Sequence, residues 1–219
     1  MTAQKHIFWE ALILTIFVFA FGILMGYLLE SNRTSKILEA YQQSDLNLLD
    51  IKIQDSIFSL KDFNCELATK ETINFADRVY EEAKILDRFE DSATLSEGII
   101  MQHKKYDLLR TSLWVNTIKI KKECEENFHT IIYFYNYRTE DLDTSSTQNV
   151  FSKYLSELKK EYGNKIILIS IAGNMDINSI NFLKSTYNID SLPMILVDEE
   201  HKISKLDDLD KIKKYLGEI

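Results

Sequence analysis

The longest apolar run of the chain covers residues 7–29, which read IFWEALILTIFVFAFGILMGYLL, with Glu10 as the only charge. A helix of this length spans roughly 34 Å, enough to cross the roughly 30 Å hydrocarbon core of a bilayer. Trp9 and Tyr27 lie near its two ends, where amphipathic rings favour the membrane–water interface. The pattern predicts one transmembrane helix within residues 1–30, and the lipid bilayer is then a partner of the chain.

A cleavable signal peptide is the main alternative to an anchor. Its apolar region would hold about 7–15 residues before a small-x-small cleavage site. This run is longer, and Tyr-Leu-Leu-Glu-Ser at residues 27–31 is a poor cleavage site. A buried core helix is the other alternative, but no polar stripe interrupts the run. We therefore expect a single-pass protein with an uncleaved anchor.

The residues that flank the run leave its orientation open. Lys5 precedes it and Arg33 and Lys36 follow it, so the positive-inside rule hardly discriminates. Gly22 and Gly26 form a small-xxx-small pair that would let two anchors pack closely as a homodimer. Such pairs are also common by chance, so a monomeric anchor is the alternative.

Helix periodicity continues through residues 31–128, and neither glycine nor proline occurs between Gly26 and Gly98. Polar breaks at residues 62–64 and 90–92 divide the segment into three. Apolar residues recur in each part at steps of three or four residues or at sums of such steps: Leu38, Leu46, Leu49, Ile53, Ile57 and Leu60; Phe75, Val79, Ala83, Leu86 and Phe89; Leu95, Ile99, Tyr106, Leu113, Ile120 and Cys124. The pattern predicts three antiparallel helices packed by these stripes. Alternatively, the first helix continues the membrane helix as a stalk or coiled coil.

The two cysteines, Cys65 and Cys124, are placed by this layout at the open end of a helical hairpin. With the turn near Ser92, they lie 27 residues before and 32 residues after its tip. The axial offset is then about 7–8 Å, so we expect the two residues within bonding distance, with Cα atoms less than about 7 Å apart. We expect the soluble part outside the cytoplasm, where the pair would form a disulfide. In the cytoplasm, two buried free thiols are the expectation instead.

After Asn127 the apolar runs become short and rich in β-branched and aromatic residues. Strands are predicted at residues 129–135, 165–171, 193–197 and 201–204. A polar loop at residues 136–146 leads into a helix whose apolar face holds Val150, Phe151, Tyr154, Leu155 and Leu158, and two more helices are predicted at 177–187 and 207–216. The order is β-α-β-α-β-β-α, with a right-handed crossover between the first two strands.

This order, together with Tyr187-Asn-Ile-Asp-Ser-Leu-Pro-Met-Ile-Leu-Val197, resembles thioredoxin. In that family a helix ends in Tyr-x-Ile/Val-x-x-Ile/Val-Pro-Thr, and the proline is cis and opens the third strand beside the active site. Here Leu192-Pro193 matches, Met194 takes the threonine position, and Pro193 is the only proline. The resemblance covers about the last 90 residues and implies a thioredoxin-like α/β domain at residues 129–219, after an anchor at 1–30 and a helical segment at 31–128.

The chain departs from thioredoxins at the residues that carry their chemistry. The family has Cys-x-x-Cys just after the first strand, whereas residues 137–143 here read Tyr-Arg-Thr-Glu-Asp-Leu-Asp. The acidic residue that thioredoxins bury in that strand is also absent. Without a thiolate this stretch has no nucleophile for disulfide exchange, so the resemblance does not imply redox activity there. It does imply that the backbone of Ser191 and Leu192, before Pro193, pairs with an extended peptide. Alternatively, Pro193 serves only the turn.

Composition excludes two further classes of function. The net charge of −8, with basic residues interleaved among acids, argues against a nucleic-acid partner. The four histidines (His6, His103, His129 and His201) are isolated in sequence, so we expect neither a metal site nor another cofactor. Four polar residues at the start of the first C-terminal helix are expected to cap it rather than to catalyse: Thr139, Glu140, Asp141 and Asp143.

Three functions follow from these patterns. The first is a non-catalytic, membrane-tethered interaction or scaffold module that binds a protein or peptide. The second is a membrane-tethered thiol-disulfide oxidoreductase that uses Cys65 and Cys124, although no cluster of basic residues marks either as an activated thiolate. The third is a helical stalk that oligomerises and displays the C-terminal domain. We rank the interaction module first.

Overall fold

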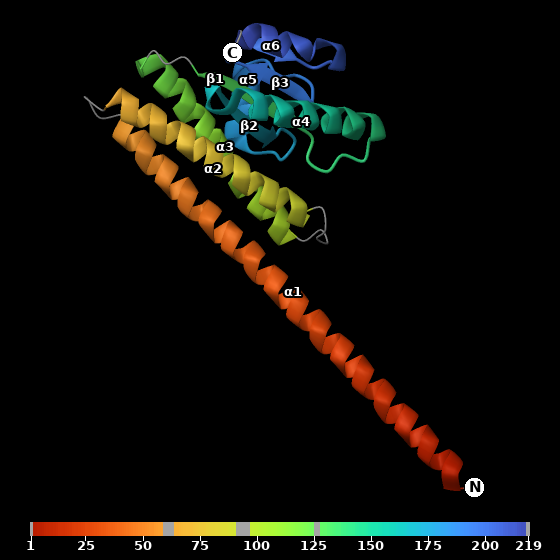
Figure 1. Cartoon of the computed structure of the whole chain (residues 1–219). Coiled ribbons are helices and arrows are strands. Elements are labelled where there is room, and N and C mark those ends of the chain that lie inside the picture. The colour runs from red at the N-terminus through yellow and green to blue at the C-terminus, as the bar shows by residue number, and fades with distance from the viewer. Residues whose placement is uncertain (1, 59–63, 91–96, 125–127, 218–219) are drawn as a thin grey trace. The chain divides into compact units, whose positions relative to one another are not determined.

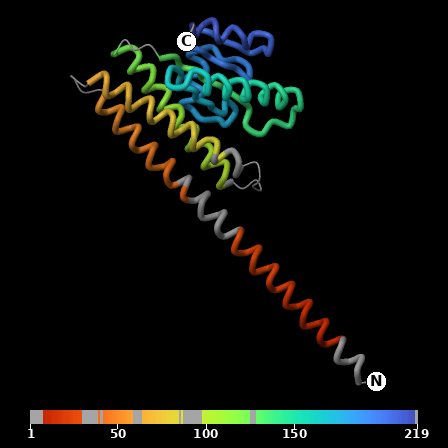
Figure 2. The backbone as a smooth tube through the Cα atoms, viewed as in Figure 1, coloured from red at the N-terminus to blue at the C-terminus, as the bar shows by residue number. Residues whose placement is uncertain are grey.

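The structure is a computed structural model of the 219-residue chain. It describes residues 2–58, 64–90, 97–124 and 128–217. The chain divides into two compact units, Met1–Gln42 and Gln43–Ile219, and helix α1 (Thr2–Phe58) contributes residues to both. Figures 1 and 2 trace the path of the backbone from the N-terminus to the C-terminus.

The first unit consists of α1 residues. Its segment Phe8–Leu29 is the one helical segment of the described residues that is long and apolar enough to cross a membrane, by length and composition. None of this segment is buried, and large side chains such as Phe17 and Phe19 are exposed. An unbroken helix suits this composition because it satisfies its own backbone hydrogen bonds. The predicted apolar helix is confirmed, whereas its insertion into a membrane stays a prediction.

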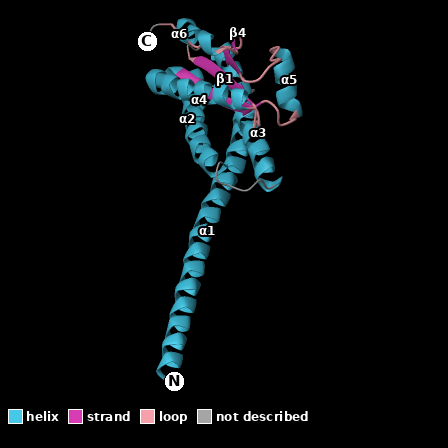
Figure 3. Cartoon of the chain, turned by 90° about the vertical axis from the view of Figure 1, so that its right-hand side faces the viewer, coloured by secondary structure: helices cyan, strands magenta, loops and turns pink. Residues whose placement is uncertain are grey.

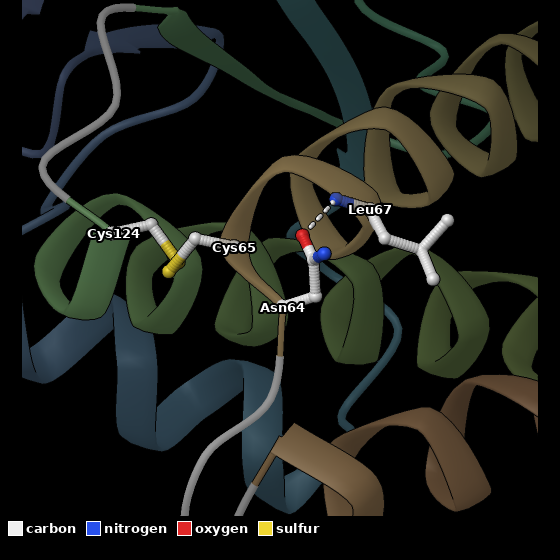
Figure 4. Close-up of a disulfide and its surroundings, with 4 residues drawn as sticks. All are labelled: Asn64, Cys65, Leu67 and Cys124. Carbon is white, nitrogen blue, oxygen red and sulfur yellow. Dashed lines mark hydrogen bonds between the residues drawn. A yellow bond between two sulfur atoms is a disulfide. The ribbon is translucent and has the colours of Figure 1, made fainter.

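The second unit contains the last part of α1 and the helices α2 (Cys65–Glu90) and α3 (Glu97–Cys124). These helices begin and end close to the predicted polar breaks, and the connections at residues 59–63 and 91–96 lie outside the described part of the chain. Asn64 caps α2, because its Oδ1 accepts the N–H of Leu67 at 3.0 Å (Figure 4). Lys121 and Lys122 in the last turn of α3 suit the negative end of that helix.

The apolar stripes predicted for α2 and α3 are buried. Their fully buried members are Phe75, Val79 and Leu86 on α2, and Tyr106, Leu113 and Ile120 on α3. The Tyr106 hydroxyl also donates a hydrogen bond to the carbonyl oxygen of Val79, which ties the two helices together. Ala83, Ile99 and Cys124 are half-buried, and the side chains of Phe89 and Leu95 lie outside the described residues.

The prediction that the first stripe is buried against the other helices is wrong. Leu46, Leu49, Ile53 and Ile57 are all exposed, and the side chains of Leu38 and Leu60 lie outside the described residues. The opposite face of α1 is buried instead. Its buried residues are Ser44, Asn47, Ile51 and Phe58.

Polar contacts explain why this other face of α1 turns inward. The side-chain amide of Asn47 donates to both carboxylate oxygens of Glu82 on α2, at 2.9 and 3.0 Å. The carbonyl oxygen of Ile51 accepts from the Asn116 amide of α3 at 3.3 Å. Such bonds stabilise buried polar groups that would otherwise be costly. The face of α1 that contacts α2 and α3 is therefore partly polar and partly apolar, whereas the apolar stripe of α1 is exposed.

The C-terminal part of the second unit has the predicted order of strands and helices. Figure 3 shows its strands in magenta among the surrounding helices. Its elements are β1 (His129–Tyr135), α4 (Leu142–Tyr162), the 3-10 turn η1 (Gly163–Lys165), β2 (Ile166–Ala172), α5 (Asn178–Thr186), β3 (Met194–Val197), β4 (His201–Ile203), the 3-10 turn η2 (Leu206–Asp208) and α6 (Asp210–Leu216). The four strands form one mixed sheet in the order β2-β1-β3-β4. β1 and β2 are parallel, and the pairs β1–β3 and β3–β4 are antiparallel.

Two predicted boundaries in this region are wrong. The polar loop after β1 ends at Asp141 rather than at residue 146, because the Asp141 carboxylate caps α4 by accepting the N–H of Thr144 at 2.8 Å. The last helix begins at Asp210 rather than at residue 207, because η2 takes up the residues before it. Polar residues at helix starts read as loop in the sequence although they belong to the first turn.

Helices pack on the sheet according to the alternation of its side chains. Ile131 and Tyr133 of β1 face a core built with α4 and α6, which includes Phe151, Leu155 and Ile212. On the other face, Phe134 meets Trp114 of α3, with ring centroids 5.8 Å apart. Because successive strand residues point to opposite faces, one apolar strand contributes to both layers.

The sheet is also tied to α3 through the turn between β3 and β4. Asp198 and Glu199 in this turn have positive φ values of 49° and 61°. Lys121 of α3 donates to the Asp198 carboxylate at 2.7 Å, and Trp114 of α3 donates to Glu199 at 2.8 Å. These contacts hold two non-glycine residues in a region of backbone space that costs free energy.

Candidate functional site

Three loops meet at one edge of the sheet, which we call the loop edge. It consists of residues 136–141 after β1, 173–177 after β2 and 190–193 before β3. They meet because the parallel strands β1 and β2 end at the same edge, where the antiparallel strand β3 begins. The N–H of Gly173 donates to the carbonyl oxygen of Tyr135 at 2.8 Å and fixes the first two loops to each other.

Side-chain amides hold the loop after β1 in place. The N–H of Tyr137 donates to Asn174 Oδ1 at 2.7 Å, and the Asn174 amide donates back to the Tyr137 carbonyl at 3.1 Å. Gln148 of α4 pairs in the same reciprocal way with the backbone of Asn136, at 2.7 and 3.2 Å. The loop edge is therefore a fixed surface before any ligand arrives.

The polar residues of this loop serve the helix that follows. Hydrogen bonds from Thr144 hold the pKa of Asp141 below its usual value, as expected for the N-cap of α4. The Thr139 hydroxyl accepts the N–H of Asp141 at 3.3 Å, while Glu140 and Asp143 are exposed. The expectation that these residues cap α4 is confirmed for Asp141.

The segment 190–193 offers backbone groups at the loop edge. Ser191 is exposed, Leu192 is half-buried and Pro193 is buried. The Leu192–Pro193 peptide bond is cis, as the resemblance to thioredoxin implies. Among the described residues, nothing hydrogen-bonds to the backbone of Ser191 or Leu192. The Leu192 side chain lies over Gly173, where a Cβ would come within 2.8 and 2.9 Å of its two methyl carbons.

A buried polar cluster on α3 lies behind the loop edge. His103 Nε2 is 2.9 Å from the Tyr135 hydroxyl and 3.4 Å from Asp107 Oδ2, and the His103 ring lies over Tyr137 with centroids 4.1 Å apart. Asp107 Oδ1 is 3.4 Å from both Arg110 and the N–H of Ala172. Burial raises the pKa of Asp107, while His103 and Arg110 act to lower it. A carboxylate on α3 thus supports the end of β2.

A cavity of about 420 Å³ lies between α2, α4 and the strands β1 and β2. Lys84 and Arg110 contribute basic groups to its wall, and Tyr133 and Gln148 contribute further polar groups. The Tyr133 hydroxyl donates to the carbonyl of Gln148 at 3.3 Å, and burial raises the pKa of Tyr133 above its usual value. The cavity includes no residue of the segment 190–193.

The cysteine pair has the approach that the hairpin layout predicts. The sulfur atoms of Cys65 and Cys124 lie 2.10 Å apart, at disulfide distance, and the Cα atoms lie 5.5 Å apart (Figure 4). Cys65 is the first residue of α2 and Cys124 the last of α3, so the pair joins the two helices at one end. The expected approach is confirmed at the level of distance, and a bridge in the cell stays a prediction.

The two predicted sites lie at opposite ends of β1. Near the cysteine end of α3, Lys121 reaches Asp198, next to the start of β1. Near the other end of α3, His103 reaches Tyr135 at the finish of that strand. A strand of this length spans about 20 Å. The structure therefore does not bring the cysteines together with Ser191, Leu192 and Pro193.

Sequence analysis missed the cluster on α3 because it treated His103 as an isolated histidine. A signal was present: His103, Asp107 and Arg110 recur at steps of four and three, which places them on one helix face. Among the described residues, no group of histidines, cysteines and carboxylates could hold a metal ion.

A scan against models of protein families finds no match for this chain, and a search of curated proteins finds no significant relative.

Proposed function

We propose that this protein is a membrane-anchored, non-catalytic binding module that captures an extended peptide at the loop edge by strand addition. The observation that carries the proposal is the backbone of Ser191 and Leu192, which makes no hydrogen bond within the described chain. Free N–H and C=O groups beside a sheet are what an added strand pairs with. The fixed loops around this segment lower the ordering cost of binding.

The proposal includes a thioredoxin-like fold for residues 129–219. Its support is the order of strands and helices, the mixed four-stranded sheet and a proline just before β3. It also includes an antiparallel three-helix middle made of the end of α1, α2 and α3. The support here is the set of contacts from α1 to both other helices, among them Asn47–Glu82 and Lys119–Asp55 at 3.2 Å.

We also propose that the loop edge catalyses no reaction. No cysteine occurs in residues 136–141, and the carboxylate of Asp141 is engaged as a helix cap. The buried Asp107 faces His103 and Arg110 rather than the segment 190–193. Binding without a reaction is the function that uses the groups available there.

A peptide-display experiment tests this function. Full-length protein in lipid nanodiscs is used to select binders from a random peptide library, and the selected peptides are then titrated against variants. Ser191→Pro removes one backbone N–H and should weaken binding at least tenfold, since a peptide carbonyl loses its partner. Ser191→Ala keeps the N–H and should bind within twofold of the original protein. The thermal midpoints of both variants establish that the fold is intact.

Two results would contradict peptide capture at this segment. One is selection of peptides that bind Ser191→Pro as well as the original protein. The other is a folded, nanodisc-bound protein that selects no peptide at all.

A second candidate function is thiol-disulfide exchange by a membrane-tethered oxidoreductase that uses Cys65 and Cys124. The pair at disulfide distance favours it, together with the position of Cys65 at the start of α2, where the helix dipole favours a thiolate. Under this alternative, either single serine variant accumulates mixed disulfides with partner proteins on non-reducing gels. Under peptide capture, neither variant does so.

A further inference from the structure

The cavity between α2, α4 and the sheet reaches from the protein surface into the core of the second unit. Lys84 and Ser152 in its wall are exposed and form its rim, whereas Arg110 and Tyr133 are buried and form its floor. Its volume of about 420 Å³ lies within the range of roughly 300–1,000 Å³ that is typical of small-molecule sites. Because its wall includes no residue of the segment 190–193, the cavity is separate from the proposed peptide surface.

Small side chains keep this space open. The wall includes Ala83 of α2, Ser152 and Ser156 of α4, and Ser170 of β2. Ser152 and Ser156 are four residues apart, so they lie on the same side of α4. Ser170 is half-buried in a strand whose other residues are buried. Larger residues at these positions would fill the space, so the cavity is a property of the sequence.

The charged residues in the described wall of the cavity, Lys84 and Arg110, are both basic. The carboxylates that pair with them lie outside this wall. Glu81 lies 2.6 Å from Lys84, and Asp107 lies 3.4 Å from both Arg110 and His103. A guanidinium group has five N–H donors, more than one carboxylate at that distance accepts from. An anionic group in the cavity would therefore meet two cations and no carboxylate of the described wall.

The remainder of the wall can hold the carbon body of a ligand. Tyr80, Tyr133 and Tyr135 supply aromatic rings, and Leu155 and Leu168 supply aliphatic carbon. The rings of Tyr133 and Tyr135 are stacked, with centroids 5.7 Å apart. A flat or short apolar group packs well on such rings. An apolar wall with a few placed polar groups is typical of sites for small molecules.

We infer that this cavity binds a small organic anion, whose acidic group pairs with Arg110 at the floor and whose entry is favoured by Lys84 at the rim. Carboxylate and phosphate groups match the fork of a guanidinium group, which binds either of them through two hydrogen bonds. Such bonds are stronger at a buried position, where water competes less. The inference goes beyond peptide capture and does not depend on it.

Fluorine NMR of small probes tests the inference with the full chain in phosphatidylcholine nanodiscs. The anionic probes are 4-fluorobenzoate and 4-fluorophenyl phosphate, the neutral probe is 4-fluorobenzyl alcohol, and empty nanodiscs give the background. We expect at least one anion to bind at least tenfold more tightly than the alcohol, because only the anion pairs with Arg110. The tighter of the two anions identifies the acidic group. Equal binding of the alcohol would overturn the inference, as would the absence of binding by both anions.

Substitutions in the cavity wall locate the bound anion. Ser156→Leu fills part of the cavity without changing a charge and should weaken anion binding at least tenfold. Lys84→Gln should weaken it about threefold, since an exposed cation attracts an anion through water and salt. Lys153→Gln is the matched control, because Lys153 is an exposed lysine of α4 outside the cavity wall, and it should leave binding unchanged. Arg110 is kept, since its loss would leave the buried Asp107 without this cation.

The thermal midpoint of each variant establishes that its fold is intact. If Ser156→Leu lowers the midpoint, Ser152→Leu at the exposed rim takes its place. A folded leucine variant that binds the anion as well as the original protein would overturn the inference. Equal weakening by Lys84→Gln and Lys153→Gln would also overturn it, because general surface charge would then explain the binding. Ser191→Pro should leave anion binding unchanged, so a failure of peptide capture is distinguishable from a failure of this site.

Discussion

Asp198, in the turn between β3 and β4, forms hydrogen bonds to both α3 and β1. Its carboxylate accepts from Lys121 at 2.7 Å and from the N–H of Thr130 at 2.9 Å, and lies 2.6 Å from His129 Nδ1. Burial alone would raise the pKa of Asp198, but the hydrogen bonds from Lys121, His129 and Thr130 and the charge of Lys121 hold that pKa below its usual value. The ionised form is thus the one that the fold stabilises.

Asp198→Asn should lower the free energy of unfolding by about 2 kcal/mol at pH 7, because Lys121 loses its charged acceptor in a partly buried position. The pKa of Asp198 is lower in the folded state than its unfolded value of about 3.9. Its contribution is therefore complete above that pH and is lost as the pH falls through the folded-state value. Urea denaturation of the full chain at pH 7, 5 and 3 should show the gap between original and variant closing only below about pH 4. A gap of equal size at pH 3 would contradict this role.

Gly173 is the residue on which the position of Leu192 depends. Gly173→Ala would place a Cβ less than 3 Å from two Leu192 carbons, so the side chain must move. We expect a loss of about 1 kcal/mol in unfolding free energy and at least fivefold weaker peptide binding at the loop edge. Gly163→Ala is the control, because it destabilises the fold through its φ of 54° while no atom lies within 4 Å of the new Cβ. Equal effects of both variants on peptide binding would contradict a specific role of Gly173 at the binding surface.

At the scale of elements, the sequence predicted where helices and strands occur better than which of their faces are covered. The stripes of α2 and α3 are buried as the periodicity predicted, and β1 has the predicted bounds. The stripe of α1 is exposed because the periodicity identifies an apolar face and says nothing about what covers it. Asn47 and Glu82 decide the orientation of α1, and their pairing 35 residues apart has no local pattern.

At the candidate site, too, the sequence predicted some features and missed others. Pro193 and the segment before it were recognisable because a short motif carries them. The reciprocal pairs of Asn174 with Tyr137 and of Gln148 with Asn136 were not, since amide side chains are common in loops and their partners lie far along the chain. The loop edge could thus be located from sequence, whereas its rigidity could not.

The cysteine pair gives a prediction about the helices that it joins. Cys65 and Cys124 are 59 residues apart. In the chain-entropy model, a bridge that closes a loop of this size stabilises the native state by roughly 4 kcal/mol. The double variant Cys65→Ser, Cys124→Ser should lose most of that, measured by urea denaturation of oxidised protein. Addition of reductant should bring the original protein down to the level of the variant. Mass spectrometry of unreduced, alkylated protein from the cell should find no free thiol, and two alkylated cysteines would contradict the bridge.

At the scale of the whole molecule, the segment Phe8–Leu29 is long and apolar enough to cross a membrane, by length and composition. The segment Phe8–Leu29 exposes large side chains along its whole length, which in water would cause aggregation. A bilayer removes that cost, because the helix satisfies its own backbone groups and the lipid covers its side chains.

The last prediction concerns the membrane and the side on which the second unit lies. The full chain should remain in the pellet after a carbonate wash, and Ile16→Arg, Phe19→Arg should release much of it, because each charge near the centre of a span costs about 3 kcal/mol in insertion. The same two substitutions at the exposed Leu142 and Phe182 serve as the control and should release none.

Protease added outside intact cells should then degrade residues 43–219 and leave a short membrane-protected fragment. This outcome has to agree with the state of the cysteines, because an extracytoplasmic compartment permits the bridge and the cytoplasm keeps thiols reduced. Protection of the second unit until the cells are permeabilised, together with free thiols at Cys65 and Cys124, would place that unit inside. Release of the original protein by carbonate would contradict the anchor itself.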